Sequence, residues 1–75
     1  IRKIVVHKDL QNQNFDGWDL QGINLRAANL VDSSLVGAKL NNSDLRNANL
    51  MRANLMLAQV ENTDFRNAIL TGAYI

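Results

Sequence analysis

The sequence predicts an all-β fold, a parallel β-helix whose turns have four short sides. Two observations predict it: a large apolar residue stands at every fifth position from Leu10 to Ile75, and related segments recur after twenty residues. A step of five residues would carry apolar side chains around every face of an α-helix, so no apolar stripe would form. Short extended segments joined by regular turns account for the pattern instead.

Each five-residue unit has a centre, the large apolar residue, and a small residue two positions earlier. From Ala28 to Ala73 this small position holds only Ala, Ser and Thr. Residues two apart in an extended segment point to the same side. We therefore expect the centre and the small residue to point inward together and to fill a narrow core.

The residue two positions after each centre is predicted to form a corner. The four glycines of the chain all stand there, and asparagine occupies the same position at Asn12, Asn42, Asn47, Asn62 and Asn67. Both residue types tolerate a positive φ better than others, as certain tight turns require.

A longer period indicates how many corners close one turn of the helix. Residues 24–30 read NLRAANL, residues 44–50 read DLRNANL, and residues 64–70 read DFRNAIL. Twenty residues make four sides, and successive turns of a parallel ladder stack at about 4.8 Å. We therefore expect a square coil of twenty residues.

These units resemble the pentapeptide repeat family. The resemblance rests on segments such as AANLV (28–32), NSDLR (42–46), NANLM (47–51), RANLM (52–56) and NTDFR (62–66). It implies a right-handed quadrilateral β-helix, and the chain from Leu10 onward supplies about three coils of 20 residues. The handedness is what the resemblance implies and does not follow from the spacing.

The N-terminal end departs from the repeat. Residues 1–9 lack it and are predicted to form an arm or cap, whereas residues 10–75 form the β-helix. Trp18 and Ile23 occupy the small position and, with Phe15, are expected to cover the first coil, because terminal repeats of solenoids are atypical. The chain begins with Ile1, so we expect it to be a processed or excised part of something longer.

Composition excludes several classes of function. The net charge is +1 and there is no cysteine, so neither a nucleic-acid partner, an anionic membrane nor a thiolate metal site is expected. His7 is the only histidine and has no partner in a recognisable pattern. We predict no catalytic, cofactor-binding or metal-binding residue, no cofactor and no enzymatic activity. Without a targeting or membrane-spanning segment in these residues, we favour a cytoplasmic location.

One charged column is predicted on the surface. Arg26, Arg46 and Arg66 recur at twenty residues, with Asp44 and Asp64 on the same face. The column is either an anion-binding ladder or a set of mutually paired charges, and we favour pairing. Exposed pairs of this kind contribute only about 0–1 kcal/mol each to folding stability.

Two groups of apolar residues are candidate interaction surfaces. Outward positions after the centres place a patch around one corner, and methionine adapts to varied partners. The patch consists of Val31, Val36, Met51, Met56 and Leu57. The second group lies at the C-terminal end and consists of Ile69, Leu70, Tyr74 and Ile75.

The C-terminal end also presents an edge of unpaired backbone groups, which a solenoid must cap, cover or pair. Either the natural chain continues past Ile75, or two chains stack end to end as a homodimer that buries the same surface on both subunits. The sequence leaves both solutions open.

For function, the sequence favours a non-enzymatic structural or protein-interaction scaffold that presents rigid ladders of side chains to an unidentified protein partner. The resemblance suggests one alternative, because one branch of the family binds DNA gyrase or topoisomerase by imitating DNA. That activity needs a strongly negative surface, which the net charge of +1 disfavours.

Overall fold

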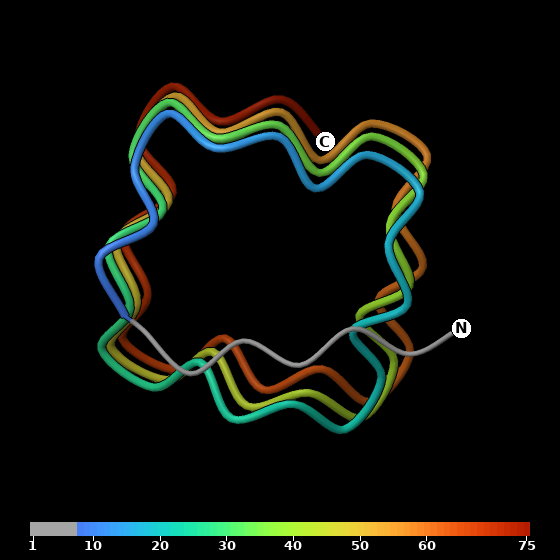
Figure 1. Ribbon diagram of the computed structural model, residues 1–75. Helices are drawn as coiled ribbons and strands as arrows, with labels where there is room; N and C mark the ends of the chain where they lie inside the picture. Colours follow the sequence, from blue (N-terminus) through green and yellow to red (C-terminus); the bar gives the residue numbers. More distant parts are fainter. Residues whose placement is uncertain (1–7) are drawn as a thin grey trace.

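The computed structural model describes residues 8–75. Their backbone winds in superposed turns, so that segments from different parts of the chain follow nearly the same square path (Figure 1). The predicted N-terminal arm, residues 1–9, lies outside the described residues except for Lys8 and Asp9, and His7 lies outside them as well.

The sides of the turns pair through single residues that stand twenty apart in the chain. Asp9 pairs in parallel with Asn29, Asn29 with Asn49, and Asn49 with Ile69. Equivalent pairs join the other three sides, among them Asn14 with Ser34 and Asp44 with Asp64. Each side is too short to form a longer strand, and no helix occurs among residues 8–75. The twenty-residue period expected from the sequence is present.

The corners have the backbone conformation that the sequence predicted. The residue two positions after each centre has a positive φ, from Asn12 (61°) to Gly72 (70°). The Trp18 N–H donates to the Phe15 C=O at 3.0 Å across such a corner. A positive φ at the third residue is what a type II turn requires. Three corners carry residues for which this φ is unusual, namely Ala27, Arg52 and Leu57.

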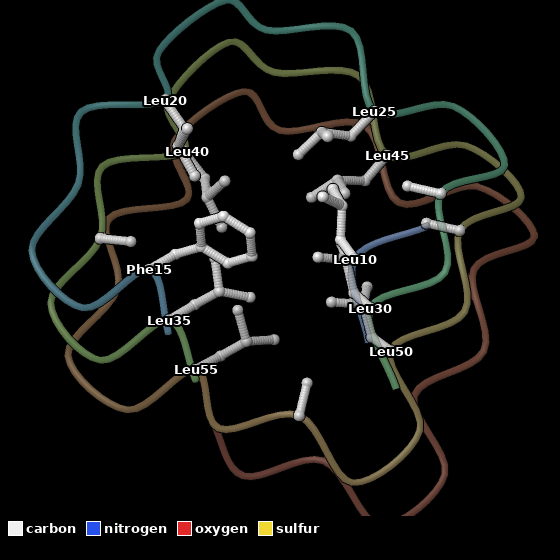
Figure 2. Close-up of a cluster of buried hydrophobic side chains, with 14 residues drawn as sticks. Leu10, Phe15, Leu20, Leu25, Leu30, Leu35, Leu40, Leu45, Leu50 and Leu55 are labelled. Atoms are coloured by element: carbon white, nitrogen blue, oxygen red, sulfur yellow. The ribbon is translucent and has the colours of Figure 1, made fainter. Parts of the chain in front are cut away.

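The core consists of the centres and the small residues. Phe15, Leu35 and Leu55 form one column of inward-pointing side chains, and the leucines of the opposite side face them across the helix (Figure 2). Ala48 and Leu45 are completely buried, and the predicted inward positions are buried throughout the inner turns. The interior is narrow because one small residue per side allows opposite sides to approach.

The two ends of the core differ in exposure. Leu20 and Leu25 belong to the first turn, yet each is only 1% exposed. Trp18 packs edge-on against Phe15, with ring centroids 4.9 Å apart, and Ile23 also packs on the core. At the other end Val60 is 41% and Ile75 is 86% exposed. The core is therefore closed at its N-terminal end and open at its C-terminal end.

Candidate interaction surfaces

The predicted corner patch is only partly exposed. Val31, Val36 and Met51 are half-buried, whereas Met56 is 49% and Leu57 is 83% exposed. The most exposed apolar groups of the patch therefore lie in its last two residues.

An ion pair divides this patch. The corner between Val31 and Val36 carries Asp32, and Arg52 occupies the equivalent corner of the next turn. The Arg52 Nε lies 2.7 Å from the Asp32 Oδ1. The Met51 Sδ accepts a hydrogen bond from the Arg52 guanidinium at 3.1 Å. Charge thus separates the two columns, which do not form one continuous apolar surface.

The C-terminal end of the helix is hollowed. A cavity of about 120 Å³ lies there, and its lining consists of Leu55, Ala58, Val60, Phe65, Leu70 and Ile75. Leu70 and Ile75 were predicted from the sequence. Ile69 and Tyr74, also predicted, do not line the hollow, because they stand one position before a centre and are exposed on the sides of the helix.

The hollow and the exposed end of the patch are continuous along the chain. Met56 and Leu57 stand between Leu55 and Ala58, both of which line the hollow. We call the combined area the corner–end surface, and it consists of Met56, Leu57 and the six lining residues. The sequence placed its parts in two separate groups and did not indicate Leu55, Ala58, Val60 and Phe65, which also line the hollow.

The charged column is a chain of ion pairs. Arg46 donates two hydrogen bonds to Asp44, at 2.9 and 2.8 Å, and its Nε lies 3.7 Å from Asp64 in the next turn. Arg66 pairs with Asp64 at 2.7 Å, and Arg26 lies 3.7 Å from Asp44. Each arginine of the column therefore lies within 3.7 Å of a carboxylate, as the pairing alternative predicted, although the three arginines outnumber the two aspartates.

These pairs shift the acidic side chains towards the charged form. The hydrogen bonds from Arg46 lower the pKa of Asp44 to about 2. The hydrogen bond from Arg66 lowers the pKa of Asp64, and that from Arg52 lowers the pKa of Asp32. Both carboxylates of the column are therefore ionised and paired at neutral pH.

The Asp and Asn residues just before the centres have a role that the sequence analysis missed. The Asn49 Oδ1 accepts the N–H of Met51 at 3.1 Å, and the Asn54 Oδ1 accepts that of Met56 at 3.1 Å. The N–H just after each centre has no partner in the backbone ladder. A short side-chain oxygen two residues earlier supplies one, as in other Asx turns. The recurrence of Asp or Asn just before the centres was the feature of the sequence from which this role could have been predicted.

Two buried side-chain atoms among residues 8–75 have no hydrogen-bond partner, the Gln11 Oε1 and the Ser43 hydroxyl. The Ser43 hydroxyl lies in the core without a hydrogen bond, because the C=O of Leu40 accepts the Thr63 hydroxyl at 2.7 Å instead. Ser43 is the third residue of the sequence Asn41-Asn42-Ser43, which fits a glycosylation site. Its inward position, expected from the spacing, disfavours that modification.

Two kinds of feature are absent from residues 8–75. These residues hold no cluster of His, Cys, Asp or Glu side chains able to bind a metal ion. They also include no helix that is long and apolar enough to cross a membrane.

The described residues form a parallel β-helix built from five-residue units. Three features define it: a single bridge on each side, a positive φ at each corner and a period of twenty residues. The chain belongs to the pentapeptide repeat family. The family description "Pentapeptide repeats" matches residues 9–42 and 33–72, with eight copies of the repeat. The resemblance noted in the sequence is therefore confirmed.

The solved structures similar to this chain include three pentapeptide repeat proteins. The pentapeptide repeat protein Rfr23 from the cyanobacterium Cyanothece 51142 is 31% identical, with a TM-score of 0.79 over 81% of this chain. A pentapeptide repeat protein of the Arabidopsis thaliana thylakoid lumen is 33% identical over 87% of this chain, with a TM-score of 0.48. HetL from Nostoc sp. strain PCC 7120, a protein involved in heterocyst differentiation regulation, is 29% identical over 81%, with a TM-score of 0.32.

The relatives are longer than this chain. It covers 42% of the Cyanothece protein, 52% of the Arabidopsis protein and 37% of HetL. No curated protein sequence matches the chain significantly.

Proposed function

We propose that this chain is a non-enzymatic protein-interaction module, built as about three coils of a right-handed quadrilateral β-helix, and that it binds a protein partner through the corner–end surface. The observation that carries the proposal is Leu57. Its side chain is 83% exposed, and its φ is 62°.

Leu57 is unfavourable for folding in two respects. A left-handed conformation costs a residue with a Cβ about 1–2 kcal/mol, and an exposed leucine gains nothing from burial. Asn42, Asn62 and Asn67 show which residue type suits this position when only the turn matters. Strained residues concentrate at functional sites, which supports a role for Leu57 in contact with a partner.

The surroundings of Leu57 support an apolar contact. Met56 beside it is 49% exposed, and methionine adapts its shape to varied partners. Leu55 and Ala58 connect both residues to the hollow at the end of the helix. The two aspartates of the Arg–Asp column are already paired with arginines of their own turns, so these pairs offer little to an electrostatic partner.

The same pairing argues against imitation of DNA. Asp44 and Asp64, the acidic residues of that column, are both engaged with arginines, and the net charge of the chain is +1. A supercoiling assay tests this alternative directly, and we expect no inhibition of DNA gyrase by the purified chain.

The proposal is tested by photo-crosslinking. A photo-reactive amino acid at Met56 should crosslink one defined protein in an extract of cells that express the chain. The same group at exposed Lys39, on another side, is the control and should not. Leu57→Asn should abolish the product although it relieves the strained turn. The proposal is wrong if Met56 yields no product, or if Leu57→Asn leaves the product unchanged.

A further inference from the structure

Two turns of the charged column show how an arginine on this side of the helix binds a carboxylate. Arg46 stands two residues after Asp44, and its Nε and Nη2 donate to the two carboxylate oxygens at 2.9 and 2.8 Å. Arg66 binds Asp64 in the same way, at 3.0 and 2.7 Å. A guanidinium group matches a planar carboxylate through two parallel hydrogen bonds. The column therefore repeats one kind of site, in which an arginine holds an anion with two oxygens.

The first turn repeats this site without its carboxylate. Asn24 stands two residues before Arg26, where the later turns carry aspartate. Its Oδ1 accepts the Arg26 backbone N–H at 3.1 Å, so the turn is preserved although the negative charge is absent. The Arg26 Nε lies 3.7 Å from Asp44, but both oxygens of that carboxylate already accept hydrogen bonds from Arg46. Because the Arg26 side chain is 53% exposed, its guanidinium is accessible to an anion from outside the chain.

A second cation is held at the same place. The Lys8 Nζ donates to the backbone C=O of Arg26 at 2.8 Å and lies 3.5 Å from the Asn24 Oδ1. An ammonium group has three donors, and these two contacts leave one of them for a ligand. Two positive side chains therefore share one neutral amide. Nearby like charges repel one another, and an anion bound by both relieves that repulsion.

The distribution of charge also favours an anion on this side of the helix, where basic side chains outnumber acidic ones. They are Lys8, Arg26, Arg46 and Arg66, against Asp44 and Asp64. Elsewhere among residues 8–75 the acidic side chains are in the majority. They are Asp9, Asp16, Asp19, Asp32 and Glu61, against Lys39 and Arg52. The small net charge of the whole chain therefore conceals one positive side, which attracts an acidic ligand.

We propose that Arg26 and Lys8 form a binding site for the carboxylate of an acidic protein segment, whose Asp or Glu side chain takes the place of the aspartate missing from the first turn. The Arg26 guanidinium binds the two oxygens as Arg46 binds those of Asp44, and the remaining Lys8 donor binds one of them. A carboxylate is the ligand, in preference to a phosphate, because the equivalent site in each of the next two turns holds one.

This site goes beyond the proposed function, because it is separate from the corner–end surface. Arg26 follows the bridge residue Asn24, whereas Met56 follows the bridge residue Asn54, which stands two sides further along the coil in the register of twenty. In a square coil these two sides are opposite each other (Figure 1). One protein partner bound at the corner–end surface therefore leaves the Arg26 side accessible.

Asn24→Asp tests the site because it restores the missing carboxylate within the chain. The introduced aspartate should engage Arg26 and so exclude the ligand, while its oxygen still accepts the backbone N–H of the turn. Asn54→Asp is the matched control, because it changes the net charge equally at the equivalent position of the opposite side. The probe is a tetraglutamate peptide, acetylated and amidated so that it carries only side-chain carboxylates. It is titrated against the full chain at low salt, where exposed charges are least screened.

Nuclear magnetic resonance of the Arg26 Nε–H and of the backbone amides around it measures the binding. We expect the peptide to shift the Arg26 signal more than that of Arg66. The dissociation constant should be roughly fivefold higher for Asn24→Asp than for Asn54→Asp, on the order expected for one lost exposed charge pair. Arg26→Gln should weaken binding to a similar extent, because it removes the guanidinium and keeps the length of a polar side chain.

Three outcomes would overturn the inference. The first is a titration in which the Arg26 signal does not move. The second is an equal dissociation constant for Asn24→Asp and Asn54→Asp, which would reduce the effect to net charge. The third is tighter binding of a phosphoserine peptide of the same charge, which would assign the site to a phosphate. The proposed function is judged separately, by the crosslink at Met56.

Discussion

The Asp16 carboxylate accepts the backbone N–H of Val36, which lies one turn further along the helix, at 2.9 Å. On most sides of the helix, the N–H of the residue just after the centre donates to the side chain of an Asp or Asn two residues earlier. Here that residue is Ser34, whose hydroxyl instead donates to the same carboxylate at 2.5 Å. The same replacement of a local acceptor occurs at Glu61. The residue just before its centre, Val60, is Gln59 instead of Asp or Asn, and the Glu61 N–H donates to the Asn41 Oδ1 of the preceding turn. A missing local acceptor is thus replaced by one from the neighbouring turn.

This relationship predicts a destabilised variant and its rescue. Asp16→Ala leaves the Val36 N–H without an acceptor, so we expect a loss of about 1 kcal/mol in the free energy of unfolding. Adding Ser34→Asn supplies a local acceptor and should restore most of that loss. Urea unfolding of the two single variants and the double variant measures the coupling. If the effects of Asp16→Ala and Ser34→Asn on the free energy of unfolding simply add, the introduced asparagine does not take over the role of Asp16 and the prediction is wrong.

Ile69→Asn should stabilise the chain. Ile69 stands where an Asp or Asn belongs, and the N–H of Thr71 has no side-chain acceptor among residues 8–75. An asparagine there would accept that N–H and remove a large exposed apolar group, for a gain of about 0.5–1.5 kcal/mol. Thermal unfolding measures it. Ile69→Gln is the control, because its longer side chain does not form the same turn, and an equal gain from glutamine would refute the mechanism.

The stability of the fold should fall in acid between about pH 4 and 2. The pKa of Asp44 is lowered to about 2 in the folded chain by Arg46, against about 3.9 in an unfolded one. The unfolded state therefore binds more protons in this range, and the stability that is complete above pH 4 is lost as pH falls through the folded pKa. Melting temperatures measured from pH 7 to 2 follow the loss.

Asp44→Asn is the matched control for this pH dependence. Asparagine keeps the oxygen that accepts the Arg46 N–H, at 3.2 Å in the present chain, but it cannot titrate. We expect a smaller decline between pH 4 and 2 in this variant, with the remainder due to Asp64 and Asp32, whose pKa values are also lowered. Identical profiles for the two proteins would show that the ion pair does not contribute.

Two buried serines should respond to alanine in opposite directions. The Ser33 hydroxyl donates to the C=O of Leu30 at 2.7 Å, so Ser33→Ala should cost about 1 kcal/mol. The Ser43 hydroxyl is buried without a partner, so Ser43→Ala should stabilise by up to about 2 kcal/mol. Chemical denaturation of both variants compares them, and a destabilised Ser43→Ala would mean that its hydroxyl has found an acceptor.

Leu57→Asn should raise stability while it removes binding. Its φ of 62° suits asparagine, so the relief of strain should add about 1 kcal/mol to the free energy of unfolding. Leu57→Ala should gain less, because alanine lacks the short polar side chain with which asparagine hydrogen-bonds the local backbone in the left-handed conformation. Calorimetry of the three proteins checks this order, and a loss of stability in Leu57→Asn would show that the leucine packs usefully within the chain itself.

Much of the fold could be predicted because the repeat encodes it locally. A centre at every fifth position and a small residue two places earlier assign inward and outward sides without knowledge of distant contacts. The buried centres, such as Leu45, and the corner φ values, such as that of Asn42, follow from these rules. The sequence by itself therefore determined the architecture, its period and the family.

Only the tertiary structure decided how the turns share their polar groups and which side chains line the open end of the core. Asp16 and Val36 are twenty residues apart, and no spacing rule indicates that one replaces the missing acceptor of the other. The Asp32–Arg52 pair that separates Val31 from Val36 likewise arises from the stacking of turns, and so does the hollow lined by Leu55 and Ala58. A repeat fixes where a side chain points, whereas its neighbours in the turns above and below fix what it touches.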